Sequence, residues 1–187
     1  MVGREIIRRG LSAGNDHRVG GRPASPAAPT LRRSATLMKP YKIPESVLVV
    51  IHTSALDVLV LERADRPGFW QSVTGSLDAP DEPLAATAAR ELFEETGIVA
   101  DGETIRLRDW QLSNIYEIYP VWRHRYAPGV THNTEHVFSV CVPRTIPILL
   151  SPREHLRYAW LPLLEAADRC FSSSNAEAIL QLPRQRA

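Results

Sequence analysis

The sequence is poor in cysteine: its 187 residues include only Cys141 and Cys170. A zinc ribbon requires two closely spaced cysteine pairs, and small secreted domains are held together by several disulfides. Neither pattern is present. We therefore expect a protein of the reducing cytoplasm.

Long apolar runs and a surplus of one charge are missing as well. A membrane-spanning helix needs about 18 consecutive apolar residues, whereas the apolar run at residues 47–51 has the length of a strand. The formal net charge of +1 provides no general field that would attract nucleic acid or an anionic membrane. We expect neither as a partner, so an anionic ligand would have to be held by local groups.

Charge is unevenly distributed along the chain. Residues 1–37 contain 7 basic and 2 acidic residues, a balance of +5, which leaves 15 basic and 19 acidic residues, or −4, for residues 38–187. The first segment is also rich in proline and glycine and has no period that would bury a face. We predict a disordered basic leader at residues 1–37 and one folded domain at residues 38–187. A flexible tail, an upstream extension that ends before Met38 and a mitochondrial transit peptide are the alternatives for the leader, and the absence of an amphipathic helical period argues against the last.

From residue 46 onward the apolar pattern becomes regular. It predicts strands at residues 47–52, 58–62, 69–74, 104–113, 117–122 and 135–142. Apolar residues spaced by four predict a helix over residues 84–96 that ends at Gly97, and further helices are expected at residues 161–170 and 174–182. Strands interleaved with helices and hairpins indicate an α+β fold with a mixed β-sheet between helices.

The helix predicted at residues 84–96 is unusually acidic near its C-terminal end. Glu91 lies three residues before Glu94 and four before Glu95, so the three carboxylates project from neighbouring positions of the helix surface. Like charges repel there, and the negative end of the helix dipole adds to the repulsion. Carboxylate oxygens are the ligands that Mg²⁺ and Mn²⁺ prefer, and these cations bridge to phosphate oxygens. A solvated acidic face is the simpler interpretation of the acids taken alone.

The surrounding residues favour the metal-binding interpretation, because residues 75–98 resemble the Nudix box, G-x5-E-x7-R-E-U-x-E-E-x-G-U with U apolar. One departure is visible: six residues separate Gly75 from Glu82, where the family has five, so either the loop carries one inserted residue or Asp81 takes the place of the glutamate. The resemblance implies the α/β/α sandwich of Nudix hydrolases and Mg²⁺-dependent hydrolysis, with Mn²⁺ as a possible substitute. The residues that match the pattern are Glu82, Arg90, Glu91, Leu92, Glu94, Glu95, Gly97 and Ile98.

The resemblance continues over about residues 40–182, through stretches such as residues 69–76, 123–131 and 158–161. It extends to the Nudix hydrolases of bacterial folate synthesis that cleave a pterin triphosphate. It implies hydrolysis of 7,8-dihydroneopterin triphosphate to dihydroneopterin monophosphate and pyrophosphate. Carried over residue by residue, it implies three metal ligands, namely Glu91, Glu95 and Glu154. The implied substrate contacts are Lys42, Arg63, Thr74, Tyr116, Glu117, Ile118, Tyr119 and Ser172.

The remaining catalytic roles are expectations from chemistry. Glu94 and Glu154 both have the chemistry of a general base, and Arg90 is expected to orient the neighbouring carboxylates. Arginine suits bidentate phosphate contacts, although Lys42 or Arg63 at a strand end in solvent is an equally ordinary arrangement. Oligomeric state is left open.

Three other functions remain as alternatives. A nucleotide-sanitising Nudix hydrolase acting on dNTPs or oxidised purine triphosphates would share the fold and the acidic helix and differ only in the base pocket. A binding module without turnover is expected to lack at least one acid of the box, and all are present. An RNA-binding protein led by the arginine-rich leader is disfavoured by the acidic remainder of the chain.

Overall fold

The computed structural model describes residues 41–185. The predicted basic leader, residues 1–37, lies outside the described residues. The strands are β1 (Glu45–His52), β2 (Asp57–Arg63), β3 (Trp70–Gln71), β4 (Val73–Ser76), β5 (Leu107–Glu117), β6 (His132–Cys141) and β7 (His155–Pro162). The helices are α1 (Leu84–Thr96), the 3₁₀ helix η1 (Pro120–Arg125), α2 (Leu163–Arg169) and α3 (Ser173–Gln185).

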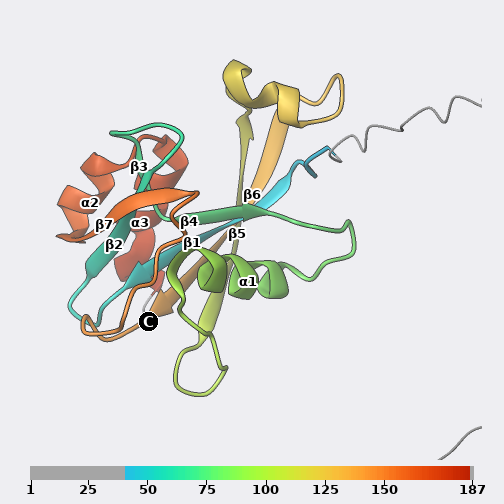
Figure 1. Ribbon diagram of the computed structural model, residues 1–187. Coiled ribbons are helices and arrows are strands. Elements are labelled where there is room, and N and C mark those ends of the chain that lie inside the picture. Colours follow the sequence, from blue (N-terminus) through green and yellow to red (C-terminus); the bar gives the residue numbers. More distant parts are fainter. Residues whose placement is uncertain (1–40, 186–187) are drawn as a thin grey trace, which may run out of the picture. The chain divides into compact units, whose positions relative to one another are not determined.

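One mixed sheet forms the centre of the fold of residues 41–185 (Figure 1). Its strand order is β3-β2-β1-β6-β5, with β4 also paired to β1 and β7 also paired to β2. The β1–β6 pair is parallel, and the other pairs are antiparallel. Strands β5 and β6 extend away from the rest of the sheet toward η1. The predicted α+β architecture with a mixed sheet is confirmed.

Helices cover both faces of the sheet, which explains why β1 is apolar at nearly every position. Val47, Val49 and Ile51 pack into one core with Leu92 of α1. The intervening residues of β1 pack into a second core with α2 and α3. Successive side chains of a strand point to opposite faces, so a strand buried on both faces reads as a continuous apolar run.

Helix α1 begins and ends where the sequence predicts. Pro83 adopts an extended conformation just before its first residue, and Gly97 ends it with a φ of 73°. This left-handed conformation favours glycine, and the Gly97 N–H donates to the carbonyl of Phe93 at 2.8 Å. The acidic positions 91–95 therefore fall in the last two turns of a helix with fixed ends.

Other predicted boundaries are wrong. The strand predicted at 117–122 does not form: β5 ends at Glu117, and Pro120, which has no N–H to donate to a strand ladder, begins η1. The strand predicted at 104–113 instead spans Leu107–Glu117. The segment 69–74 is divided into β3 and β4, and β7 continues through Pro162, so the helix predicted from residue 161 begins at Leu163.

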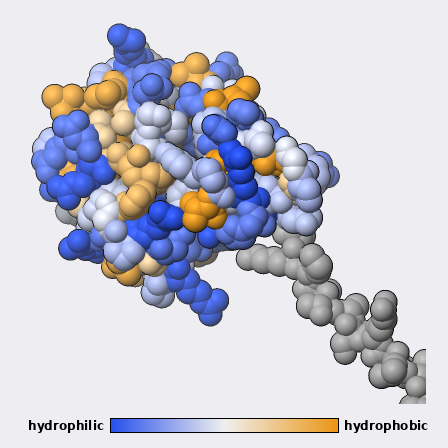
Figure 2. Space-filling view, turned by 90° about the horizontal axis from the view of Figure 1, so that it is seen from above, coloured by the Kyte–Doolittle hydropathy of each residue, from blue (hydrophilic) through white to orange (hydrophobic). Residues whose placement is uncertain are grey.

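The surface of this unit is mixed in polarity. On the face shown in Figure 2, hydrophobic residues lie in several separate patches between hydrophilic ones. Among the described residues, no helix has the length and apolar content needed to cross a membrane.

Candidate active site

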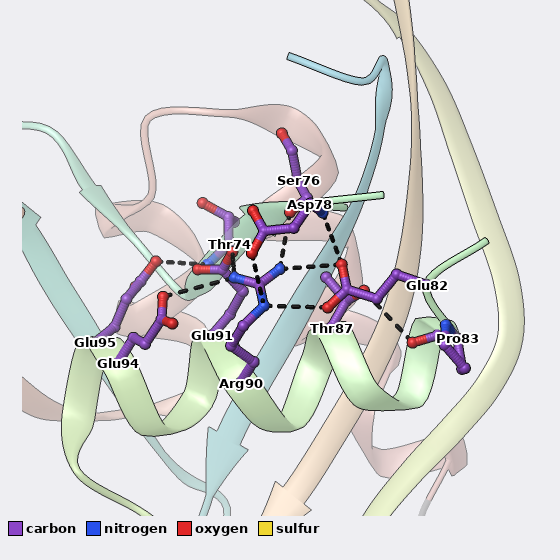
Figure 3. Close-up of polar contacts among 10 residues, drawn as sticks. All are labelled: Thr74, Ser76, Asp78, Glu82, Pro83, Thr87, Arg90, Glu91, Glu94 and Glu95. Carbon is purple, nitrogen blue, oxygen red and sulfur yellow. Dashed lines mark hydrogen bonds and ion pairs between the residues drawn. The ribbon is translucent and has the colours of Figure 1, made fainter. Parts of the chain in front are cut away.

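Three glutamates of α1 differ sharply in their exposure. The Glu95 side chain is 3% exposed and that of Glu91 12%, whereas Glu94 is 51% exposed. Glu91 and Glu95 point toward β4, and Glu94 lies beside them on the outer side (Figure 3). The predicted grouping of the three carboxylates is therefore present, with two of them enclosed by protein.

Arg90 connects the helix to the loop that precedes it (Figure 3). Its guanidinium donates to Glu91 Oε1 at 2.7 Å, to Glu82 Oε1 at 3.1 Å and to the carbonyl of Ser76 at 3.1 Å. Glu94 lies 3.5 Å away as a further ion-pair partner. Although burial lowers it, the pKa of Arg90 is raised overall by the hydrogen bonds to Glu82 and Glu91. Arg90 thus fixes the orientation of Glu91 and holds the loop against the helix.

The loop carries one residue more than the family pattern, and the contacts of Glu82 show where it fits. Glu82 Oε2 accepts the N–H of Asp78 at 2.7 Å, closing the loop on itself. Glu82 also binds Arg90, so Glu82 is a residue that connects the loop to the helix. The extra residue lies within the loop and does not displace α1.

Gly75 is required by the close approach of β4 to Glu91. A Cβ atom at this position would lie 1.8 Å from Glu91 Cδ and 1.9 Å from its Oε1. These distances are far inside van der Waals contact, so any side chain at residue 75 would displace the Glu91 carboxylate. The first residue of the box is therefore glycine for steric reasons.

A second group of ligand atoms lies at the end of α1. Glu95 Oε2 is 2.7 Å from His155 Nε2, with both side chains buried. Together with the exposed Glu154, these residues offer three ligand atoms that lie within 4.8 Å of one another. The loop before β7 thus brings residues 154 and 155 to a helix about 60 positions earlier in the chain.

His155 was not predicted as a residue of the site. Its position next to Glu154 was the available signal, but the partner Glu95 is distant in sequence, and a lone histidine has no local pattern. Its second ring nitrogen, Nδ1, is buried without a hydrogen-bond partner among the described residues.

The buried carboxylates are protonated more readily than free ones. Burial raises the pKa of Glu91 to about 7, and the neighbouring charges of Glu95 and Glu94 add to this effect while Arg90 opposes it. Burial also raises the pKa of Glu95, against the hydrogen bond from His155. A divalent cation would offset this repulsion and desolvation, so the carboxylates of Glu91, Glu95 and Glu154, which interact through their charges, fit a hard metal ion.

A chain of hydrogen bonds leads from this acidic group to Arg63. The N–H of Thr74 donates to Glu95 Oε1 at 3.4 Å, and Thr74 Oγ1 accepts from Gln71 Nε2 at 3.1 Å. Gln71 Oε1 in turn accepts from Arg63 at 2.8 Å. Asp65 holds the same guanidinium with two hydrogen bonds of 2.8 Å. Of the predicted substrate contacts, Thr74 thus contacts Glu95 directly, and Arg63 is connected to it through Gln71.

The other predicted substrate contacts lie at the end of β5 and before α3. Tyr116 is half-buried, Ile118 is buried, and Glu117 is exposed and paired with Arg123. Ser172 accepts the N–H of Asn175 at 3.3 Å in the turn that begins α3. Lys42 is exposed, and its backbone N–H donates to the carbonyl of Arg125 at 2.8 Å.

An aromatic cluster lies between these segments. Phe171 has its ring centroid 5.1 Å from that of Phe69, 6.2 Å from Tyr119 and 6.1 Å from Trp122. The Arg63 guanidinium lies 5.0 Å from the centre of the Trp122 ring. Aromatic faces of this kind are suited to a flat ring, so a planar group bound at the cluster would lie near Arg63.

Comparison with known proteins agrees with this geometry. Residues 42–182 match the model of the NUDIX domain. The chain is 45% identical over 144 residues to dihydroneopterin triphosphate diphosphatase of Escherichia coli strain K12, covering 76% of this chain and 94% of that protein. It is 43% identical over 148 residues to the Haemophilus influenzae protein of the same name, covering 78% and 91%.

A solved structure gives the same result at the level of the fold. The structure of the E. coli dihydroneopterin triphosphate pyrophosphohydrolase superposes with a TM-score of 0.71 and 45% identity, covering 76% of this chain and 97% of that one. The matched region contains the carboxylates of α1 and the elements around them. The chain belongs to the Nudix family.

Proposed function

We propose that this protein hydrolyses 7,8-dihydroneopterin triphosphate to dihydroneopterin monophosphate and pyrophosphate, a step of folate biosynthesis. One observation carries the proposal: identity of 43–45% to two diphosphatases named for this substrate, over 91–94% of their lengths. The reaction adds water across the bond between the first and second phosphates. We further propose a cytoplasmic enzyme that acts on a small-molecule triphosphate and has no nucleic acid partner.

The proposed metal site uses Glu91, Glu95 and Glu154, which would hold Mg²⁺, with Mn²⁺ as a possible substitute. His155 fixes the Glu95 carboxylate through the contact at 2.7 Å. A bound divalent cation neutralises charge on phosphate oxygens and makes a coordinated water more acidic.

The protein's own groups perform the remaining tasks. Arg90 orients Glu91. Among the carboxylates of the site, Glu154 and Glu94 are exposed to solvent, so an attacking water can approach them and transfer a proton to them. Of these, Glu154 lies in the group with Glu95 and His155, so it would either complete the metal site, with Glu94 as the base, or act as the base itself. We propose that Lys42 and Arg63 contact the phosphates, where cationic groups offset the charge that the metal leaves.

A substrate panel with pyrophosphate detection tests the proposal. It should include dihydroneopterin triphosphate, the four common dNTPs and an oxidised purine triphosphate, each with saturating Mg²⁺. We expect the highest kcat/KM for the pterin compound, because phosphates and metal are common to all candidates and cannot discriminate. Equal or higher kcat/KM for a dNTP or for the oxidised purine would reject the proposal and favour a nucleotide-sanitising enzyme.

A further inference from the structure

Asn133 and Glu135 form a buried polar group on the sheet face opposite α1. The group lies at the N-terminal end of α3, shortly after the aromatic residue Phe171 in sequence. Glu135 and Asn133 of β6 are 4% and 1% exposed. Asn133 Nδ2 donates to Ser46 Oγ at 2.7 Å and to Tyr116 Oη at 3.2 Å. Glu135 lies close enough for its charge to help raise the pKa of Tyr116, after burial as the larger cause.

Two acceptor atoms of this group have no partner. Glu135 Oε2 and Asn133 Oδ1 are buried and make no hydrogen bond to any described residue. Burial raises the pKa of Glu135 to about 6, against a hydrogen bond from Ser174. An unpaired buried carboxylate oxygen is costly, and the fold gives no structural reason for it. Two buried acceptors without donors, two residues apart on the same face of β6, point to a ligand that supplies the donors.

The position of this group matches one end of the candidate substrate site. Ser174, beside Glu135, is three residues after Phe171 of the aromatic cluster, and Tyr116 is three residues before Tyr119 of the same cluster. Ser72, which precedes β4, donates its N–H to Asn175 of α3 at 2.8 Å and joins this region to the strand that passes Glu91. Each of the two segments that carry the cluster therefore also carries a residue bound to the buried polar group: Ser174 to Glu135 and Tyr116 to Asn133.

We propose that Glu135 is a specificity-determining residue that accepts two adjacent N–H donors of the substrate ring, a lactam N–H and the exocyclic amine beside it. Asn133 Oδ1 is a second unpartnered acceptor on the same face of β6. This inference rests on the proposed function in that a dihydropterin carries such an edge. Guanine carries the same edge, whereas adenine presents a ring-nitrogen acceptor there and hypoxanthine lacks the amine. Because Glu135 Oε2 is covered by protein atoms, this contact requires the covering side chains to move aside when the ring binds.

The test is Glu135→Gln, which keeps the shape and replaces one acceptor oxygen with a donor. Steady-state kinetics with Mg²⁺ would use dihydroneopterin triphosphate, dGTP, dITP and dATP. We expect kcat/KM to fall about tenfold to a hundredfold for the pterin and dGTP, as for an unpaired buried polar group. For dATP we expect a change of less than about threefold, and for dITP an intermediate one. The loss should appear mainly in KM, because the substituted group lies far from the reacting phosphates.

Glu45→Gln is the matched control. Glu45 is a half-exposed carboxylate of the neighbouring strand β1 that pairs with His136, one residue from Ser46, so its side chain lies on the other face. We expect unchanged kinetics for all four substrates. Binding of 7,8-dihydroneopterin without phosphates, measured by calorimetry without metal, gives a readout independent of hydrolysis and should weaken only in Glu135→Gln.

Three outcomes would overturn the inference: equal losses for all four substrates, an unchanged kcat/KM for the pterin compound, or unchanged binding of dihydroneopterin in Glu135→Gln. Failure of the proposed function is seen separately, as a lack of pterin preference in the unsubstituted enzyme. Thermal unfolding completes the test, because removal of the buried charge predicts an equal or higher melting temperature for Glu135→Gln, and a lower one would indicate a structural role instead.

Discussion

Gly75 leaves the space that the Glu91 carboxylate occupies, so its replacement tests Glu91 without altering any charged group. In Gly75→Ala, the new Cβ would lie 1.8 Å from Glu91 Cδ, and the carboxylate must move. We expect loss of a metal ligand and a fall in kcat of about a hundredfold or more. Turnover at saturating Mg²⁺ measures this, with circular dichroism to confirm the fold. Near-normal turnover would show that Glu91 works from another position.

Glu135 gives stability a dependence on pH. Its pKa is about 6 in the folded protein, above the ordinary value of 4.5, so folding takes up a proton between these pH values. The contribution of Glu135 to the free energy of unfolding is therefore largest below about pH 4.5. It falls by about 2 kcal/mol in total as the pH rises through 6.

Glu135→Gln removes this dependence. Urea unfolding at pH 4.5, 5.5 and 7 should show the variant gaining on the unsubstituted protein as pH rises, with Glu45→Gln as the comparison. A constant difference between the two proteins across this range would contradict the expected titration.

Sequence reasoning at the residue scale succeeds where the chemistry is local. The carboxylates at positions 91, 94 and 95 and the arginine before them are neighbours by helical spacing alone, and the structure places them together. The contact between Glu95 and His155 joins positions 60 residues apart, and no local spacing signals it. Glu135 resembles any alternating polar residue of a strand until the burial of both sheet faces is known.

At the scale of elements, the C-terminal end of α1 predicts a measurable stability effect. Gly97 and Gly102 both have positive φ angles, of 73° and 75°, and alanine is strained at both. A Cβ at residue 97 would also lie 3.0 Å from Leu149 Cβ, whereas nothing lies within 4 Å at residue 102. We expect Gly102→Ala to cost about 1 kcal/mol and Gly97→Ala clearly more.

Chemical denaturation gives the free energy of unfolding of both variants. Gly102→Ala reports backbone strain alone, and Gly97→Ala reports strain together with the clash against Leu149. Because Leu149 belongs to the segment before the Glu154 loop, Gly97→Ala should also lower activity. Equal losses of stability in the two variants would mean that Leu149 moves aside without cost.

Elements with a clear period and clear ends are the predictable ones. Helix α1 has four-residue apolar spacing and a terminal glycine, and its predicted bounds agree with the structure. The end of β5 was mispredicted because apolar and aromatic residues continue past Glu117, although Pro120 already starts η1. The extent of β7 depends on its pairing with β2 across about 100 residues, which no window of local sequence contains.

For the whole molecule, the buried acids couple metal binding to stability. Desolvation and mutual repulsion of Glu91 and Glu95 destabilise the fold without a cation, and a cation bound only by the folded state stabilises it. We expect the melting temperature to rise with Mg²⁺ concentration, by an amount equivalent to about 2.7 kcal/mol at 100 times the dissociation constant.

Glu95→Gln should abolish most of this rise and reduce turnover about a thousandfold. Glu103→Gln, an exposed loop substitution outside the site, should leave both unchanged. An equal thermal shift in Glu95→Gln and the unsubstituted protein would remove Glu95 from the set of metal ligands.

The two faces of the central sheet also bear on how new specificities arise in this architecture. Glu91, Glu94 and Glu95 belong to α1, which covers one face, whereas Asn133 and Glu135 lie on the face covered by α3. Substitutions at these two positions can therefore change which ring is accepted without touching α1. Related chains can therefore diverge in substrate specificity while keeping one hydrolytic chemistry. The ring that the enzyme accepts can be altered by redesigning a single face of the sheet.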